Sequence, residues 1–220
     1  MKETNNQTTI TGKVVSEFIF SHEVMGERFY IFNISAQRTS GTEDEIPVLI
    51  SDRIIDVTQD YCGEYIIVTG QFRSFNYWEN KKRKLELFVF AQDVAFVEDE
   101  IDGSKVNQVY LEGYVVKPPI YRNTPLGREI ADLLIAVNRS YGRSDYIPCI
   151  CWGRNARYAS TFEVGDHVLL HGRIQSREYM KRISENESEK RIAYEVSVSA
   201  VKRSGKNGKA EKEDTSGKGE

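Results

Sequence analysis

Gly63-Glu64-Tyr65-Ile66-Ile67-Val68-Thr69-Gly70 and Gly165-Asp166-His167-Val168-Leu169-Leu170-His171-Gly172 share one pattern, an apolar run between two glycines. Upstream of them, Asp44-Glu45-Ile46-Pro47-Val48-Leu49 matches Asp145-Tyr146-Ile147-Pro148-Cys149-Ile150 at an offset of 101 residues. The glycine-bounded runs keep an offset of 102, so a single inserted residue separates the two matches. A register held over this distance predicts an internal repeat of two domains, each of about 100 residues.

Each copy consists of short apolar strands separated by turn residues. In the second copy this pattern predicts five strands, at residues 109–116, 130–138, 145–152, 166–179 and 192–201. The polar segment 154–162 has room for two helical turns. A short helix between the third and fourth of five strands is a property of the oligonucleotide/oligosaccharide-binding (OB) barrel. We therefore expect an all-β protein with two tandem OB-fold five-stranded barrels, each with a short helix between strands 3 and 4.

Composition divides the chain into two domains, a linker and a tail. We expect domain A at residues 8–98 and domain B at residues 107–203, joined by an acidic linker rich in small residues. Residues 204–220 are mostly Gly, Lys, Glu and Ser, with one Ala as the only apolar residue. Because such a segment buries too little apolar surface to order itself, we expect a disordered tail.

The overall composition is that of a globular protein, with 40% hydrophobic residues and a net charge of −3. There is no apolar run of 18 or more residues and no secretory signal, so we expect a cytoplasmic protein with no membrane partner. Charge is divided unevenly: residues 1–98 carry 10 basic and 15 acidic side chains, and residues 107–203 carry 15 and 11. The basic balance of domain B favours a polyanionic partner.

The sequence contains no pattern that predicts catalysis or a cofactor. The three histidines form no cluster in the sequence, and there is no phosphate-binding loop or pattern of an activated nucleophile. Cys62, Cys149 and Cys151 lack the spacing of metal ligands, so we expect buried, reduced thiols. The sequence predicts a protein that is not an enzyme and has no cofactor and no metal site.

Strand alternation places aromatic side chains on the outside of domain B. If Ile147 and Cys149 point into the barrel, Tyr146 and Trp152 point outward, because successive side chains alternate between faces. With the ring in the turn before this strand and the ring at the end of the fourth strand, the outer set is Tyr141, Tyr146, Trp152 and Tyr179. The basic residues interleaved with them are Arg139, Arg143, Arg154, Arg173, Arg177, Lys181 and Arg182. We expect the four rings to line one open cleft, since exposed rings beside cations are suited to stacking bases and following phosphates.

At these residues domain B resembles the bacterial single-stranded DNA-binding protein family. The resemblance rests on four segments, NQVYLEG at 107–113, LIAVNR at 134–139, DYIPCICWG at 145–153 and HGRIQSREY at 171–179. It implies that Tyr141, Tyr146, Trp152 and Tyr179 stack bases. It also implies single-stranded DNA binding in replication, recombination or repair, and an assembly of four barrels, which a homodimer of this chain would supply.

Two features depart from the family pattern. In domain A the matching ring positions are Ser40, Glu45 and Ser51, and only Tyr77 is aromatic. Domain A therefore contributes little to the expected stacking surface, and its acidic balance favours packing against domain B or a partner. A basic hairpin arm is a further candidate for DNA contact, with Tyr77, Trp78 and the basic run 81–84, which includes Lys82 and Arg83. The alternative is a solvated hairpin tip. Family members that recruit replication and repair proteins end in an acidic tip with Pro-Phe, and the printed sequence ends differently, so recruitment by that route is not expected.

Two other functions fit the same residues. The outer rings could cover a protein partner, as in an interaction or scaffold module such as a primosome-type accessory protein. An RNA strand also offers unpaired bases to stack. Residues alone do not separate DNA from RNA.

Overall fold

A computed structural model describes residues 5–79, 82–97, 107–182, 188–206 and 209–210. Domain A contains the strands β1 (Asn6–Val14), β2 (Ile19–Val24), β3 (Glu27–Gln37), β4 (Glu43–Ser51), β5 (Tyr65–Glu79) and β6 (Lys82–Val97). Domain B repeats them as β7 (Asn107–Val115), β8 (Ile120–Asn123), β9 (Glu129–Asn138), β10 (Ser144–Trp152), β11 (Asp166–Arg182) and β12 (Ser188–Lys206). Domain B also contains the 3-10 turn η2 (Ser140–Gly142), the helix α1 (Arg154–Ala159) and the two-residue strand β13 (Lys209–Ala210).

Each domain is a closed barrel. In domain A the strands pair in the order β3-β4-β6-β5-β1, and β1 returns to pair with β3. Domain B closes in the same way when β7 pairs with β9. The expected all-β fold of two tandem OB barrels is therefore confirmed. The sequence pattern missed β2 and β8, two short strands whose residues are mostly exposed and lack the alternation of a half-buried strand.

Alternating side chains fill the barrels. Ile147, Cys149 and Cys151 are almost fully buried in domain B, and their neighbours on β10 point the other way. Burial raises the pKa of both thiols, that of Cys151 to about 12, so both stay protonated at neutral pH. Cys62 was wrongly expected to be buried. It is exposed because it lies in the turns before β5 instead of in a strand.

The predicted helix between strands 3 and 4 forms in domain B only. In the described segment 52–64 of domain A the chain makes turns instead. The Asp56 carboxylate accepts hydrogen bonds from both the backbone N–H and the hydroxyl of Thr58. Such local side-chain contacts compete with helical hydrogen bonds, whereas Ala156 and Ala159 in α1 favour the helix.

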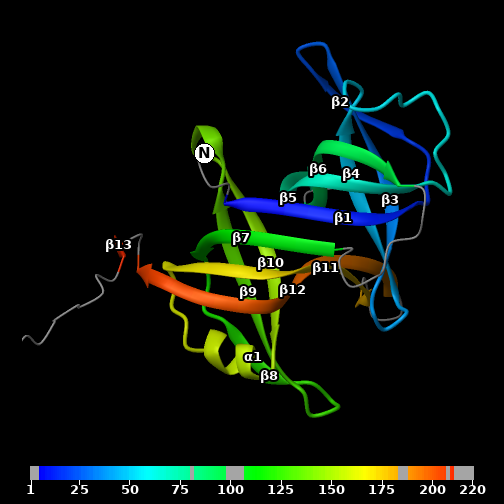
Figure 1. Ribbon diagram of the computed structural model, residues 1–220. Coiled ribbons are helices and arrows are strands. Elements are labelled where there is room, and N and C mark those ends of the chain that lie inside the picture. The colour runs from blue at the N-terminus through cyan, green and yellow to red at the C-terminus, as the bar shows by residue number, and fades with distance from the viewer. Residues whose placement is uncertain (1–4, 80–81, 98–106, 183–187, 207–208, 211–220) are drawn as a thin grey trace, which may run out of the picture.

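The two barrels share one continuous sheet. Strand β1 pairs antiparallel with β7, from Asn6 opposite Leu111 to Ile10 opposite Asn107. Figure 1 shows these two strands side by side at the centre of the molecule. The strands β6-β5-β1-β7-β11-β12 thus form a six-stranded antiparallel layer across both domains, which we call the central sheet.

The C-terminal strand extends into the segment expected to be a tail. β12 runs to Lys206, and β13 pairs with its end. Residues 207–208 and 211–220 of that segment lie outside the described residues. No helix in the described part of the chain is long and apolar enough to cross a membrane.

Candidate nucleic-acid interface

The outer face of β10 presents two of the predicted rings. Tyr146 and Trp152 are each 37% exposed, at opposite ends of the strand. The indole Nε1–H of Trp152 donates a hydrogen bond to the Ser197 hydroxyl on β12, 3.2 Å away. The backbone N–H of Tyr146 donates to the Ser74 hydroxyl of domain A, 2.8 Å away. The Trp152 ring and the Tyr146 backbone are therefore held in place, while part of each ring remains open to solvent.

Tyr179 lies in a groove between the two domains, which we call the interdomain groove, with a volume of about 890 Å³. Pro148, from the outer face of β10, and Tyr77, from β5 of domain A, line the same groove. The cationic side chains that line it are Lys84, Lys181 and Arg191. The groove therefore joins a predicted ring of domain B to the one aromatic residue that domain A retains at the matching positions.

Tyr141 lies at a second hollow, which we call the loop cleft, with a volume of about 1240 Å³. Its side chain is fully exposed, and its backbone has a φ of 63°, a left-handed conformation that is uncommon for a residue other than glycine. Arg139 and Arg143 line the cleft from domain B, and Arg73 and Met25 line it from domain A.

The predicted rings do not line one cleft. Trp152 lines a third hollow together with Arg128 of the β8–β9 hairpin, while Tyr141 and Tyr179 line the loop cleft and the interdomain groove. The outer face of β10 lies between Tyr146 and Trp152, and a strand rises about 3.3 Å per residue, so these two rings stand roughly 20 Å apart. A ligand that reaches all four must be long and extended.

Two of the predicted DNA-binding arginines are engaged by buried carboxylates. Arg139 Nε lies 3.1 Å from Oδ2 of Asp145, and Arg173 Nη1 lies 3.5 Å from Oδ2 of Asp44. Both aspartates are fully buried. These arginines neutralise charge inside the protein, so they have less charge to offer a phosphate than the sequence pattern predicts.

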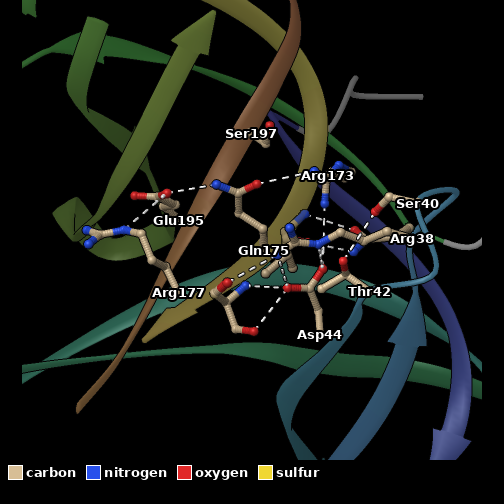
Figure 2. Close-up of polar contacts among 12 residues, drawn as sticks. Arg38, Ser40, Thr42, Asp44, Arg173, Gln175, Arg177, Glu195 and Ser197 are labelled. Atoms are coloured by element: carbon tan, nitrogen blue, oxygen red, sulfur yellow. Dashed lines mark hydrogen bonds and ion pairs between the residues drawn. The ribbon is translucent and has the colours of Figure 1, made fainter. Parts of the chain in front are cut away.

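The Asp44 contacts link domain A to β11 of domain B, as Figure 2 shows. Its carboxylate accepts two hydrogen bonds of 2.6 Å from Arg38, and one of 2.7 Å from the backbone N–H of Ser176. Burial alone would raise the pKa of Asp44, but the contacts with Arg38 and Ser176 outweigh it and hold that pKa below its usual value.

Asp145 makes the equivalent contact in the opposite direction, from domain B to β5 of domain A. Its carboxylate accepts a 2.7 Å hydrogen bond from the backbone N–H of Ser74. Here burial prevails over the contacts with Ser74 and Arg139, and the pKa of Asp145 is raised. The two contacts fix the domains against each other and thereby set the shape of the interdomain groove.

The remaining predicted cations of domain B stay on the surface. Arg177 lies 5.8 Å from the centre of the Tyr179 ring, and its Nε is 3.9 Å from Glu195, a carboxylate that also accepts a hydrogen bond from Gln175 (Figure 2). The other exposed members of the set are Arg143, Arg154, Lys181 and Arg182. The side chains of Trp78, Lys82 and Arg83 lie outside the described residues.

Sequence reasoning missed two cations at these hollows, Arg73 at the loop cleft and Arg191 at the interdomain groove. Lys84, which also lines the interdomain groove, belongs to the basic run 81–84 that the sequence singles out. Arg73 and Arg191 had no such signal, because their place depends on how β5 and β12 pass the other domain.

Taken together, the paired closed barrels and the exposed rings define a tandem OB-fold protein with an aromatic and basic surface. Residues 106–204 match the family model described as "Single-strand binding protein family". Single-stranded DNA-binding protein B of Bacillus subtilis is 36% identical over 80 residues, which cover 33% of this chain and 71% of that protein. The chain belongs to the single-strand binding protein family.

Two further relatives mark the extent of the likeness. Single-stranded DNA-binding protein 2 of Listeria innocua is 36% identical over 81 residues, and the match spans 34% of this chain and about half, 51%, of that protein. The crystal structure of the wild-type single-stranded DNA binding protein from Thermus aquaticus superposes with a TM-score of 0.68 at 23% identity. That match covers 90% of this chain and 92% of that chain, so the shared fold includes both domains.

Proposed function

We propose that the chain binds single-stranded DNA without sequence preference and performs no reaction on it. The observation that carries this proposal is the pair of partly open rings on the outer face of β10, Tyr146 and Trp152, which stand on a strand fixed by hydrogen bonds of the Tyr146 backbone and the Trp152 indole. Unpaired bases stack on such rings whatever their sequence, and exposed Arg and Lys side chains attract the phosphates. Family membership supports the same function.

The strand path we propose runs along β10. Trp152 and Tyr146 stack bases at the two ends of this strand, Tyr141 extends the path into the loop cleft, and Tyr179 extends it into the interdomain groove. A flexible, extended polyanion suits three separate hollows better than a compact ligand does. We assign the protein to the cytoplasm and to DNA replication, recombination or repair.

Replacing both Tyr146 and Trp152 by Ala tests the proposal. Each lost stack costs about 1 to 3 kcal/mol, so the affinity for labelled oligo-dT should fall at least about tenfold in fluorescence anisotropy titrations. Phe96→Ala is the matched control, because Phe96 is a 50% exposed ring on β6, which belongs to the other barrel. Unchanged affinity in the double variant contradicts the proposal, and competition with oligo-rU separates DNA from RNA.

We also propose that two chains form a homodimer with four barrels. The outer face of the central sheet carries apolar side chains between buried neighbours. Ile67 alternates with the buried Ile66 and Val68, and Leu169 alternates with the buried Val168 and Leu170. Tyr110 and Tyr114 lie on the same outer face of β7. Glu112 lies between these two tyrosines and pairs with His167 at 3.0 Å, so the face combines rings and aliphatic side chains with a polar pair. A surface of this mixed composition that spans two domains is one that another copy can cover.

A further inference from the structure

We propose that domain A carries its own base-stacking surface, built from His22, Phe29, Phe90 and Arg73 at positions that are not aromatic in domain B. The inference rests on the proposed binding of single-stranded DNA and adds a second contact region to it. It also gives domain A a role that its residues at the matching ring positions, Ser40, Glu45 and Ser51, do not suggest.

The surroundings of Trp152 provide the reference. Trp152 lies opposite Ile130 of β9 in the strand pairing, and its indole binds Ser197 of β12. The ring position of domain B thus has one large aromatic residue at the end of the third barrel strand. Its two neighbours on the adjacent strands are an aliphatic and a small polar residue.

Domain A inverts this arrangement. Ser51 takes the place of the tryptophan at the end of β4, and Phe29 lies opposite it on β3. Phe90 of β6 pairs with Leu49 of β4, and in domain B the equivalent partner of Ile150 on β10 is Ser197 of β12. The aromatic surface is therefore displaced onto the two neighbouring strands instead of being lost.

The displaced rings form a connected stack. The centres of the His22 and Phe29 rings are 5.0 Å apart, with planes inclined by only 13°, and Phe90 lies 6.0 Å from Phe29. The Arg73 guanidinium lies 3.8 Å from the centre of the Phe90 ring. An exposed imidazole lying flat on Phe29 shows that this ring face accepts a planar partner, and a guanidinium over the neighbouring ring adds a planar cation. A nucleobase is a ligand of that shape.

The stack borders a hollow that adjoins the loop cleft and shares two lining residues with it. His22, Phe29 and Phe90 line this hollow, of about 540 Å³, together with Val24 and Met25. Val24 and Met25 also line the loop cleft, where Tyr141 lies. The occupant that fits is therefore the same DNA strand, continuing from the Tyr141 loop across the tip of the β2–β3 hairpin.

Charge around the stack indicates contact through bases more than through phosphates. Arg53 lies 3.5 Å from Glu27, and Arg28 lies within 4.0 Å of both Glu23 and Asp52. These cations are offset by carboxylates, in agreement with the acidic balance of residues 1–98. The domain A surface should therefore contribute a part of the affinity that depends little on salt.

The test uses the full chain in a Trp78→Phe background, so that Trp152 is the only tryptophan. Trp152 quenching by oligo-dT of increasing length reports domain B, and ultraviolet cross-linking to bromodeoxyuridine oligonucleotides with peptide mapping reports domain A. We expect cross-links on peptides that contain His22, Phe29 or Phe90. The double variant Phe29→Leu with Phe90→Leu, which keeps apolar volume, should bind long oligo-dT roughly five- to tenfold more weakly and leave short oligo-dT unaffected. Phe96→Leu is the control.

Each outcome decides the matter. Strong Trp152 quenching in the parent chain, without cross-links in domain A and with equal affinity of the double variant for long oligo-dT, overturns the inference and leaves the proposed function standing. Absence of Trp152 quenching and of any cross-link in the parent chain overturns both. Because the cross-links are mapped on the parent chain, the test holds even if the double variant folds poorly.

Discussion

Asp44 and Asp145 occupy the second position of β4 and of β10, and each accepts hydrogen bonds from a serine of the other domain. The partners differ in strength. Arg38 binds Asp44 through two hydrogen bonds of 2.6 Å, whereas Arg139 lies 3.1 Å from Asp145. The contacts of Asp44 therefore compensate for burying its negative charge. Asp145, at the same place in the other copy of the repeat, has weaker contacts, and burial of its charge destabilises the fold.

This contrast predicts unequal effects of neutralising the two carboxylates at pH 7. Asp44→Asn leaves Arg38 without its anionic partner and should lower the free energy of unfolding by about 3 kcal/mol. Asp145→Asn removes a charge that burial disfavours and keeps an oxygen that can accept the Ser74 N–H, so its effect should be clearly smaller. Urea unfolding of the two variants measures both values, and an equal or reversed order contradicts the prediction.

The same two groups predict opposite pH dependences. The pKa of Asp44 is lowered on folding, so its stabilisation is present above the unfolded value of about 3.9 and is lost as the pH falls through the folded value. The pKa of Asp145 is raised, so the cost of its charge is absent below about 3.9 and grows as the pH rises through the folded value. In unfolding titrations from about pH 3 to about pH 7, the deficit of Asp44→Asn relative to the parent should shrink in acid. In the same acid range, the free energy of unfolding of the parent should rise relative to that of Asp145→Asn. Parallel curves for all three proteins would exclude this linkage.

For single residues, the sequence predicts which way a side chain points better than it predicts which residue the side chain contacts. Strand alternation correctly placed Tyr146 and Trp152 outward and Cys149 and Cys151 inward, because the side-chain period of a strand is local. It did not predict the ion pair between Arg173 and Asp44, because that contact crosses between domains and depends on where β11 passes the end of β4.

Among the elements, the barrel strands follow from the repeat, but the helix does not. Residues 154–159 and the corresponding residues 53–58 of domain A are segments of similar length between strands, but the domain A segment contains the β-branched residues Ile54, Ile55 and Val57, which favour a helix less than alanine does. What separates them is a local competition, in which Asp56 binds Thr58 while the domain B segment has alanines facing the core. Alignment of the two copies transfers the strand pattern but not the outcome of such a competition.

Strand β5 offers a prediction at a single bulge. The register with β6 shifts between Thr69 and Gly70, and a Cβ at Gly70 would lie 2.0 Å from the carbonyl oxygen of Phe90. That atom is backbone and has little freedom to move, so Gly70→Ala should lower the free energy of unfolding by about 2 kcal/mol or more. Thr69→Ala, at the exposed neighbouring position, is the control and should change it by less than about 1 kcal/mol. Equal unfolding midpoints for the two variants would show that the bulge tolerates a side chain.

For the whole molecule, the repeat predicts two barrels but not how they join. Nothing in β1 or β7 distinguishes a strand that pairs across domains from one at a free edge. The pairing of Thr8 with Val109 becomes visible only in three dimensions. Its consequence is the central sheet, a single surface to which both domains contribute three strands.

That surface predicts the assembly. An added charge without a partner would have to be buried in the proposed homodimer, at a cost of several kcal/mol, whereas in a monomer it would stay in water. Ile67→Arg with Leu169→Arg should therefore convert a dimer into a monomer, as measured by size-exclusion chromatography with light scattering, while circular dichroism shows that the barrels stay folded. Lys117→Glu, on an exposed residue after β7, should leave the dimer intact. A parent chain that is monomeric at micromolar concentration, or a double variant that stays dimeric, would show that the central sheet is not where two chains meet.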